Sequence, residues 1–90
     1  MSVKVRLHHY FNDFTNGQEV VESNAQTIKE LIDDLEAKFP GIKEHLVDKR
    51  GRLQGFIELF VNAEVVYPEN TNVPIKDGDL IEILMIVAGG

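Results

Sequence analysis

The chain of 90 residues contains no cysteine, and basic residues are the minority among its charges. Without cysteine it has no disulfide framework, no thiolate metal site and no cysteine nucleophile, and a reducing cytoplasmic setting is compatible with this composition. Nine Lys and Arg residues against 15 Asp and Glu residues give a formal charge of −6. This balance argues against nucleic acid as a partner, because phosphate contacts need a basic surface.

Long apolar runs are missing as well. No stretch approaches the roughly 20 apolar residues that span a bilayer, and residues 1–6 lack the basic-then-apolar order of a secretory signal. We therefore expect a cytoplasmic protein that does not enter a membrane. Because 43% of the residues are hydrophobic and no linker or internal repeat interrupts them, residues 1–90 are expected to form a single domain. Only residues 88–90 are expected to form a flexible tail.

The first part of the chain predicts an antiparallel pair of strands. Apolar residues alternate with polar ones, as is typical of a strand with one buried face, at Val3, Val5 and Leu7. The turn-rich stretch 12–17 closes with Asn16-Gly17, which is a strong hairpin signal, and a second strand is expected over residues 18–23.

A helix is expected next. Residues 27–30 have the form of a capping box, in which the Thr27 hydroxyl accepts from the Glu30 amide and the Glu30 side chain reaches back to the Thr27 amide. One apolar stripe with helical spacing comprises Ile28, Leu31, Ile32, Leu35 and Phe39. Pro40-Gly41 ends the helix, and residues 42–46 are expected to form one short extra turn.

Three more strands are expected, at residues 57–61, near 65–66 and at 80–87. The resulting order places one main helix across one face of a mixed sheet of about five strands. This is the α+β fold known as the β-grasp, or ubiquitin-like, fold. A ferredoxin-like fold is the alternative, but it needs a second long helix, and residues 41–46 are too few to form one.

Side chains that could host chemistry are few. His8 and His9 are neighbours on the first expected strand, so their rings should point to opposite faces and cannot share a metal ion. His45 is expected at the surface of the short helical turn. We therefore expect no metal site, no cofactor bound by this chain and no catalytic activity of its own.

The end of the chain, Val87-Ala88-Gly89-Gly90, directly follows an apolar strand pattern. Glycine has no Cβ, so this end can lie extended in a channel that is too narrow for side chains. With Ala88, Gly89 and Gly90 threaded into a partner's active site, the free carboxylate of Gly90 would be the group that reacts. The alternative is a frayed end without a function.

The last strand also predicts a docking surface beside this tail. If residues 81, 83 and 85 face the helix, then Leu84 and Ile86 face outward together with Glu82. The same alternation in the strand at 57–61 turns Phe60 outward. An exposed apolar patch of Phe60, Leu84 and Ile86 would mark a partner surface on a small protein. The alternative is that the loop at residues 69–74 covers these side chains.

Taken together, these features resemble the prokaryotic ubiquitin-like sulfur carriers, which include the molybdopterin synthase small subunit (MoaD) and the thiamin-pathway carrier (ThiS). The resemblance extends over nearly the whole chain and is most specific near its end, at Gly78-Asp79, Ile83 and Val87-Ala88-Gly89-Gly90. The middle of the chain is most similar to the cysteine-pathway (CysO-like) carriers, through Asp34-Leu35-Glu36-Ala37, Gly41-Ile42, Leu46, Phe56 and Val61-Asn62.

The resemblance implies a mechanism. An E1-like adenylating enzyme uses ATP to activate the Gly90 carboxylate, and a sulfur donor displaces AMP to leave a thiocarboxylate. A sulfur-accepting biosynthetic enzyme then forms cysteine, homocysteine or a related thiol. In this family an apolar patch beside the last strand docks both partners, and Leu84 occupies the position of one residue of that patch. The chain itself is expected to be a monomer when free and a protein co-substrate.

Other functions stay open. Molybdopterin subunits usually have Phe-Pro-Pro where this chain has Leu84-Met85-Ile86, which makes that role the alternative. The thiamin carrier is shorter and lacks the segment 41–55. A ubiquitin-like modifier, joined through Gly90 to a lysine of a target, needs the same activated glycine. A non-covalent interaction domain would not need the tail at all.

Overall fold

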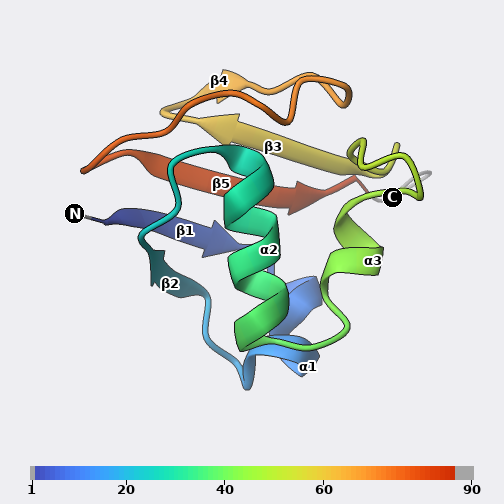
Figure 1. Ribbon diagram of the computed structural model, residues 1–90. Helices are drawn as coiled ribbons and strands as arrows, with labels where there is room; N and C mark the ends of the chain where they lie inside the picture. Colours follow the sequence, from blue (N-terminus) through green and yellow to red (C-terminus); the bar gives the residue numbers. More distant parts are fainter. Residues whose placement is uncertain (1, 87–90) are drawn as a thin grey trace.

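A five-stranded mixed sheet with one main helix across it forms the body of the protein. The computed structural model describes residues 2–86 (Figure 1). The strands follow the order β2-β1-β5-β3-β4. Their bounds are β1 Val3–Leu7, β2 Val20–Ser23, β3 Ile57–Val61, β4 Glu64–Val65 and β5 Leu80–Met85. The central pair β1 and β5 is parallel and the other pairs are antiparallel, which confirms the β-grasp prediction.

The core lies between this sheet and helix α2 (Ile28–Lys38), which crosses one face of it. Alternate residues of the two central strands are buried, namely Val3, Val5, Leu7, Ile81 and Ile83. The helix buries four of the five residues of the predicted stripe, at Ile28, Leu31, Ile32 and Leu35. The fifth, Phe39, lies just past the last helical residue as the C-cap and is half-buried. Each fully buried aliphatic side chain contributes roughly 1.5–3 kcal/mol. Apolar burial therefore holds α2 on the sheet.

Helix α2 begins with the predicted cap, apart from one bond. The Thr27 hydroxyl accepts from the Glu30 amide at 3.1 Å, as expected. The Glu30 carboxylate accepts from the amide of Gln26 at 3.1 Å, one residue before the expected donor. The Glu30 side chain thus binds the residue before the cap and not the Thr27 amide, and the two bonds together stabilise the first turn.

The connection between β1 and β2 is not the hairpin that the sequence predicts. It contains a 3₁₀ turn, η1 (His9–Phe11), and a short helix, α1 (Asn12–Thr15), and β2 begins only at Val20. Asn16 and Gly17 do adopt positive φ angles of 57° and 81°, but they end α1 instead of joining two strands. Phe11 is fully buried in the core. Its burial outweighs the local preference for a tight turn.

After α2 the chain makes the single helical turn that was expected, α3 (Lys43–Leu46). The Glu36 carboxylate accepts from the amides of Gly41 at 3.0 Å and Lys43 at 2.9 Å, and these bonds lower its pKa. Because α3 has four residues, the second long helix of a ferredoxin-like fold is absent from the described part of the chain. No helix within residues 2–86 is long and apolar enough to cross a membrane.

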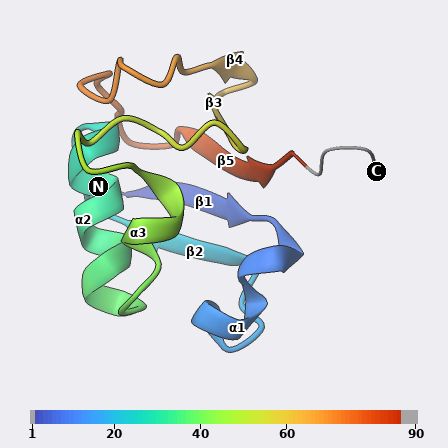
Figure 2. The same ribbon diagram turned by 90° about the vertical axis from the view of Figure 1, so that its right-hand side faces the viewer.

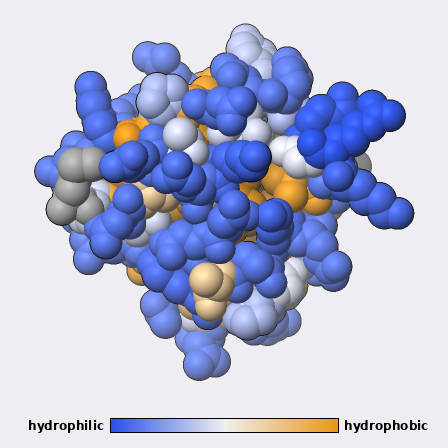
Figure 3. Space-filling view, in the orientation of Figure 1, coloured by the Kyte–Doolittle hydropathy of each residue, from blue (hydrophilic) through white to orange (hydrophobic). Residues whose placement is uncertain are grey.

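Helices α2 and α3 lie on the same side of the sheet (Figure 2). Seen from that side, the molecule presents mostly hydrophilic residues (Figure 3). We call the opposite side of the sheet the outer face. Residues that alternate with the buried positions of β3 and β5 point to this outer face, and the predicted patch lies among them.

Candidate functional site

The register of β3 and β5 determines how the predicted patch is arranged on the outer face. Phe60 lies opposite Glu82, and Leu84 lies opposite Glu58. Phe60 and Leu84 are therefore diagonal neighbours, a separation that an aromatic ring can bridge. Each apolar side chain has a carboxylate directly across from it, so the surface alternates between apolar and acidic positions.

All three predicted patch residues lie on this face. Phe60 and Leu84 are half-buried, whereas the side chain of Ile86 is 47% exposed. The Ile86 amide donates to the carbonyl of Phe56 at 2.8 Å, which continues the β3–β5 ladder one step past Met85. The strand alternation therefore predicted the positions of these side chains correctly. Their role in binding a partner stays a prediction.

Two further apolar side chains extend the patch. Phe56 is 41% exposed and lies next to Ile86 across the ladder, and Val65 is 46% exposed and lies opposite Phe60. The alternation in β3 already places Phe56 on the outer face, so sequence reasoning could have included it. Val65 becomes visible only through the pairing of β3 with β4. The term docking patch below means Phe56, Phe60, Val65, Leu84 and Ile86.

The loop at residues 69–74 does not cover the docking patch, contrary to the alternative considered above. It lies against the start of α2, on the other side of the sheet. The carbonyl of Val73 accepts from the Ile28 amide at 3.1 Å, and that of Thr71 accepts from the Lys29 amide at 2.8 Å. The loop thus satisfies helix amides that would otherwise lack partners, and the patch is left open.

Charged side chains surround the docking patch unevenly. Glu82 forms an ion pair with Arg6 of β1 at 3.7 Å. Glu58 forms no ion pair with any residue of the described range 2–86. A partner surface that fits this face would therefore combine apolar side chains with basic groups placed near Glu58.

A buried carboxylate fixes the start of β5 and hence the position of the patch. Asp79 is 6% exposed and accepts from the Asn62 side-chain amide at 2.8 Å and from the Lys76 amide at 2.9 Å. The Asn62 side-chain carbonyl in turn accepts from the Leu80 amide at 2.9 Å. The bond from Asn62, followed by that from Lys76, lowers the pKa of Asp79. This network ties β5 to the end of β3.

The expectation for the first two histidines is wrong. Strand β1 ends at Leu7, and His8 is the residue before η1, with its Nδ1 accepting from the Tyr10 amide at 3.0 Å. The rings of His8 and His9 therefore stack, with centroids 4.1 Å apart, instead of pointing to opposite faces. His45 lies near Phe14, with ring centroids 4.9 Å apart. Within residues 2–86 no group of three or more metal-ligating side chains is found.

The predicted reactive tail, Ala88, Gly89 and Gly90, lies outside the described residues 2–86. So does Val87, the last residue of the strand expected over 80–87. The site therefore consists of the docking patch and the end of β5 at Met85, from which the chain continues through Ile86.

The chain matches the model of the ThiS family over residues 5–90. It is 38% identical to the sulfur carrier protein CysO of Mycobacterium tuberculosis, and the match covers 100% of both chains. Among solved structures it is similar to a BexX/CysO complex from Amycolatopsis orientalis, with a TM-score of 0.89, 38% identity and coverage of 98% and 99% of the two chains. The crystal structure of M. tuberculosis CysO gives a TM-score of 0.87 at 35% identity, with coverage of 94% and 99%.

Proposed function

The chain belongs to the ThiS family, and on this premise we propose that it is a sulfur carrier that holds sulfur as a thiocarboxylate on Gly90. The observation that carries the proposal is the docking patch. Its members follow β3 and β5 toward the residues that precede Gly89 and Gly90. A carrier of this kind is a co-substrate of partner enzymes and not itself an enzyme.

In the proposed reaction, an oxygen of the Gly90 carboxylate attacks the α-phosphorus of ATP, and pyrophosphate leaves. A sulfur nucleophile such as hydrosulfide then attacks the carbonyl carbon of the acyl adenylate, and AMP leaves with the electron pair of the broken C–O bond. The product is a thiocarboxylate. An E1-like partner binds ATP and the sulfur nucleophile, while this chain supplies only the acyl group.

The length of the tail limits where the partner's site can lie. The Ile86 amide is held to the Phe56 carbonyl at 2.8 Å, and four residues follow it in the sequence. Fully extended, four residues span at most about 14 Å. The adenylation site should lie within that depth of the surface that contacts the docking patch. The missing side chains of Gly89 and Gly90 suit a narrow channel that excludes water.

The docking patch supplies the affinity that the tail lacks. Burial of exposed apolar surface by a partner contributes roughly 25 cal/mol per Å² before the costs of association. Phe56 and Ile86 are 41% and 47% exposed and lie at the end of β5, so their burial would also direct the tail toward the partner's site. We propose that the E1-like enzyme and the sulfur-accepting enzyme use this same patch in turn.

The similarity to CysO supports an acceptor enzyme that forms cysteine, homocysteine or a related thiol product. A molybdopterin synthase small subunit and a ubiquitin-like modifier that forms isopeptide bonds through Gly90 are the alternatives. We place the carrier in the cytoplasm, because its activation consumes ATP, and we propose that it is a monomer when free.

Intact mass spectrometry tests the proposal directly. The carrier is incubated with ATP, hydrosulfide and the E1-like enzyme, and the expected product gains the mass difference between one sulfur and one oxygen atom, located on Gly90. A variant that lacks Gly89 and Gly90 serves as the control and should gain nothing. An unchanged mass in the presence of an enzyme that makes AMP from ATP would overturn the proposal. If the chain were instead found joined through Gly90 to lysines of other proteins, it would be a ubiquitin-like modifier.

A further inference from the structure

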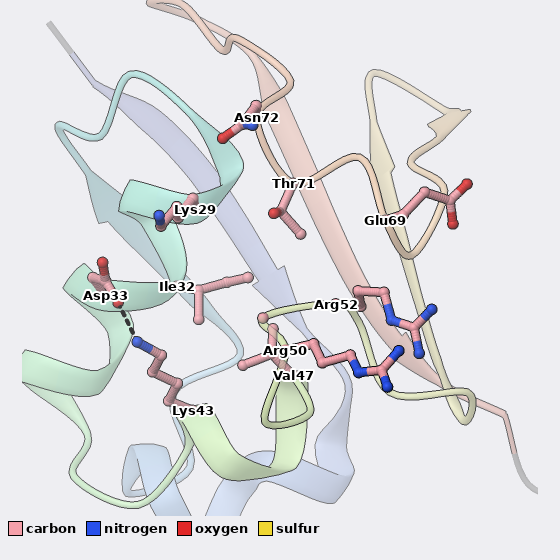
Figure 4. A pocket seen from close by; sticks show the side chains of 11 residues that line it. Lys29, Ile32, Asp33, Lys43, Val47, Arg50, Arg52, Glu69, Thr71 and Asn72 are labelled. Atoms are coloured by element: carbon pink, nitrogen blue, oxygen red, sulfur yellow. Dashed lines mark hydrogen bonds and ion pairs between the residues drawn. The ribbon is translucent and has the colours of Figure 1, made fainter.

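A cavity of about 300 Å³ opens on the α2 side of the molecule (Figure 4). Its walls come from the first half of α2, from α3 and residues 47–52 after it, and from residues 69–72. The docking patch lies on the outer face, so the sheet separates the two. No residue of the docking patch lines this cavity.

The residues that line the cavity carry a net positive charge, whereas the chain as a whole is acidic. Four of the nine Lys and Arg residues of the chain line it, against two acidic side chains, although the whole chain has a formal charge of −6. The basic members are Lys29, Lys43, Arg50 and Arg52. A concave surface with an excess of one sign of charge concentrates ions of the opposite sign.

Two of these four cations are available for a ligand. Lys43 is held by Asp33 at 2.6 Å, and Arg52 is held by Asp48 at 3.5 Å. The side chains of Lys29 and Arg50 form no ion pair or hydrogen bond with other described residues, 2–86. Both therefore retain their full capacity to donate to an anion.

The backbone that carries the arginines is held in place before any ligand binds. The Asp48 carboxylate accepts from the amides of Arg50 at 2.8 Å and Arg52 at 3.1 Å, and the Asp48 amide donates to the Arg52 carbonyl at 2.8 Å. The opposite wall is held by the bond from the Lys29 amide to the Thr71 carbonyl. Preorganised walls reduce the entropy that binding costs.

The floor of the cavity is apolar. Ile32 and Val47, which are 2% and 7% exposed, form it. Next to this floor the effective dielectric constant is lower than in bulk water, so an ion pair formed there is stronger. The Thr71 hydroxyl and the Asn72 amide also line the cavity and add neutral donors.

We propose that this cavity binds a phosphate-type oxyanion, either free or as the monoester group of a small molecule, with the Arg50 guanidinium as the main donor. Lys29 lies on the opposite wall, with its ammonium group apart from the guanidinium (Figure 4), and adds positive charge to the cavity. A guanidinium group matches tetrahedral oxyanions with two parallel donors, and an ammonium group adds a point charge. The cavity volume lies at the lower limit for small-molecule sites, which suits a small anionic group. This site goes beyond sulfur transfer and does not depend on it.

The test is a titration of the full chain with inorganic phosphate, in which the NMR chemical shifts of the backbone amides are measured at each phosphate concentration. We expect saturable shifts at residues 50–52, 71–73 and Lys29, and none at the docking patch. Arg50→Gln should weaken binding about tenfold, because one charge-assisted contact is lost. Lys49→Gln removes the same charge from the same loop at a residue outside the lining, and it should weaken binding by less than about twofold.

Each outcome decides the proposal. Non-saturable shifts, or equal losses in Arg50→Gln and Lys49→Gln, would show that only the general charge of the loop attracts phosphate, which overturns it. A second titration with glycerol phosphate should shift the same amides. Comparing its affinity with that of inorganic phosphate distinguishes a site for a monoester from a site for the free ion. If succinate binds as tightly as phosphate at the same amides, the site is a general anion site and the assignment to phosphate is wrong. Because Arg50 is exposed and only its backbone amide is hydrogen-bonded, its variant should fold normally.

Discussion

Truncation of Leu84 to alanine tests whether the docking patch serves the activation of Gly90. Leu84 is half-buried on the outer face, diagonal to Phe60 and opposite Glu58. The change removes the equivalent of roughly three methylene groups, which at ~0.8 kcal/mol each amounts to ~2.4 kcal/mol for a fully buried side chain. Because part of the side chain is already buried in the free carrier, we expect the docked complex to lose about 1 kcal/mol.

The assay is the initial rate of pyrophosphate release by the E1-like enzyme at varied carrier concentration. A loss of about 1 kcal/mol in docking should raise the KM for the carrier about fivefold. The kcat should change little, because the tail that reacts is untouched, and a binding interaction common to ground state and transition state affects KM alone.

Val20→Ala provides the matched control for this experiment. Val20 is also an aliphatic residue on the outer face, 52% exposed, but it lies on β2, two strands away from β5. Its truncation should leave both KM and kcat unchanged. An unchanged KM in Leu84→Ala, or an equal rise in both variants, would refute the assignment of the docking patch. Thermal unfolding of both variants checks that each remains folded.

Three further predictions concern stability. Ile83 is fully buried in β5. Ile83→Ala should lower the free energy of unfolding by about 3 kcal/mol, because it leaves a cavity in the core. Urea denaturation measures this loss, and a loss smaller than that of Leu84→Ala would contradict the assigned core. Thr27→Ala should cost about 1 kcal/mol by removing the acceptor at 3.1 Å from the Glu30 amide, whereas Thr27→Ser should retain most of the stability in the same assay. The pKa of Asp79 is lowered from its ordinary value of 3.8 by its bonds from Asn62 and Lys76. The carboxylate therefore stabilises the fold fully above pH 3.8 and loses this contribution as the pH falls through its folded pKa. Unfolding midpoints should thus differ most between wild type and Asp79→Asn at neutral pH and converge in acid, and a gap that stays constant with pH would contradict the network.

The candidate site was predicted in part. Alternation along β5 and β3 correctly placed Leu84, Ile86 and Phe60 on one face, because side chains in a strand alternate whatever the partner strand is. Alternation alone could not show that Phe60 and Leu84 are diagonal and that each faces a glutamate. That arrangement depends on the register between two strands that are 19 residues or more apart in the sequence. The contribution of Val65 depends in the same way on the pairing of β4.

The predictions that are wrong, the hairpin after β1 and the placement of His8 and His9, concern a segment in which burial in the tertiary structure overrides local preference. Asn16 and Gly17 have the positive φ angles that a tight hairpin would require, but in the folded chain they end α1 and do not join two strands. Burial of Phe11 draws the segment after β1 into the core and produces η1 and α1. The same early end of β1 stacks His8 on His9. The cavity could not be predicted from the sequence either, because Lys29, Arg50 and Thr71 come from three separate segments that line one cavity only in the folded chain.

The sequence by itself determined the elements: the stripe and cap of α2, the buried alternation of the strands and the tail that ends in Gly89-Gly90. These features depend on residues within one or two turns of each other, where stereochemistry and periodicity decide. Only the tertiary structure decided the parallel pairing of β1 with β5, the register of the docking patch and the position of the loop at residues 69–74. The reason is that these depend on contacts between distant segments, whose stability comes from burying both partners at once.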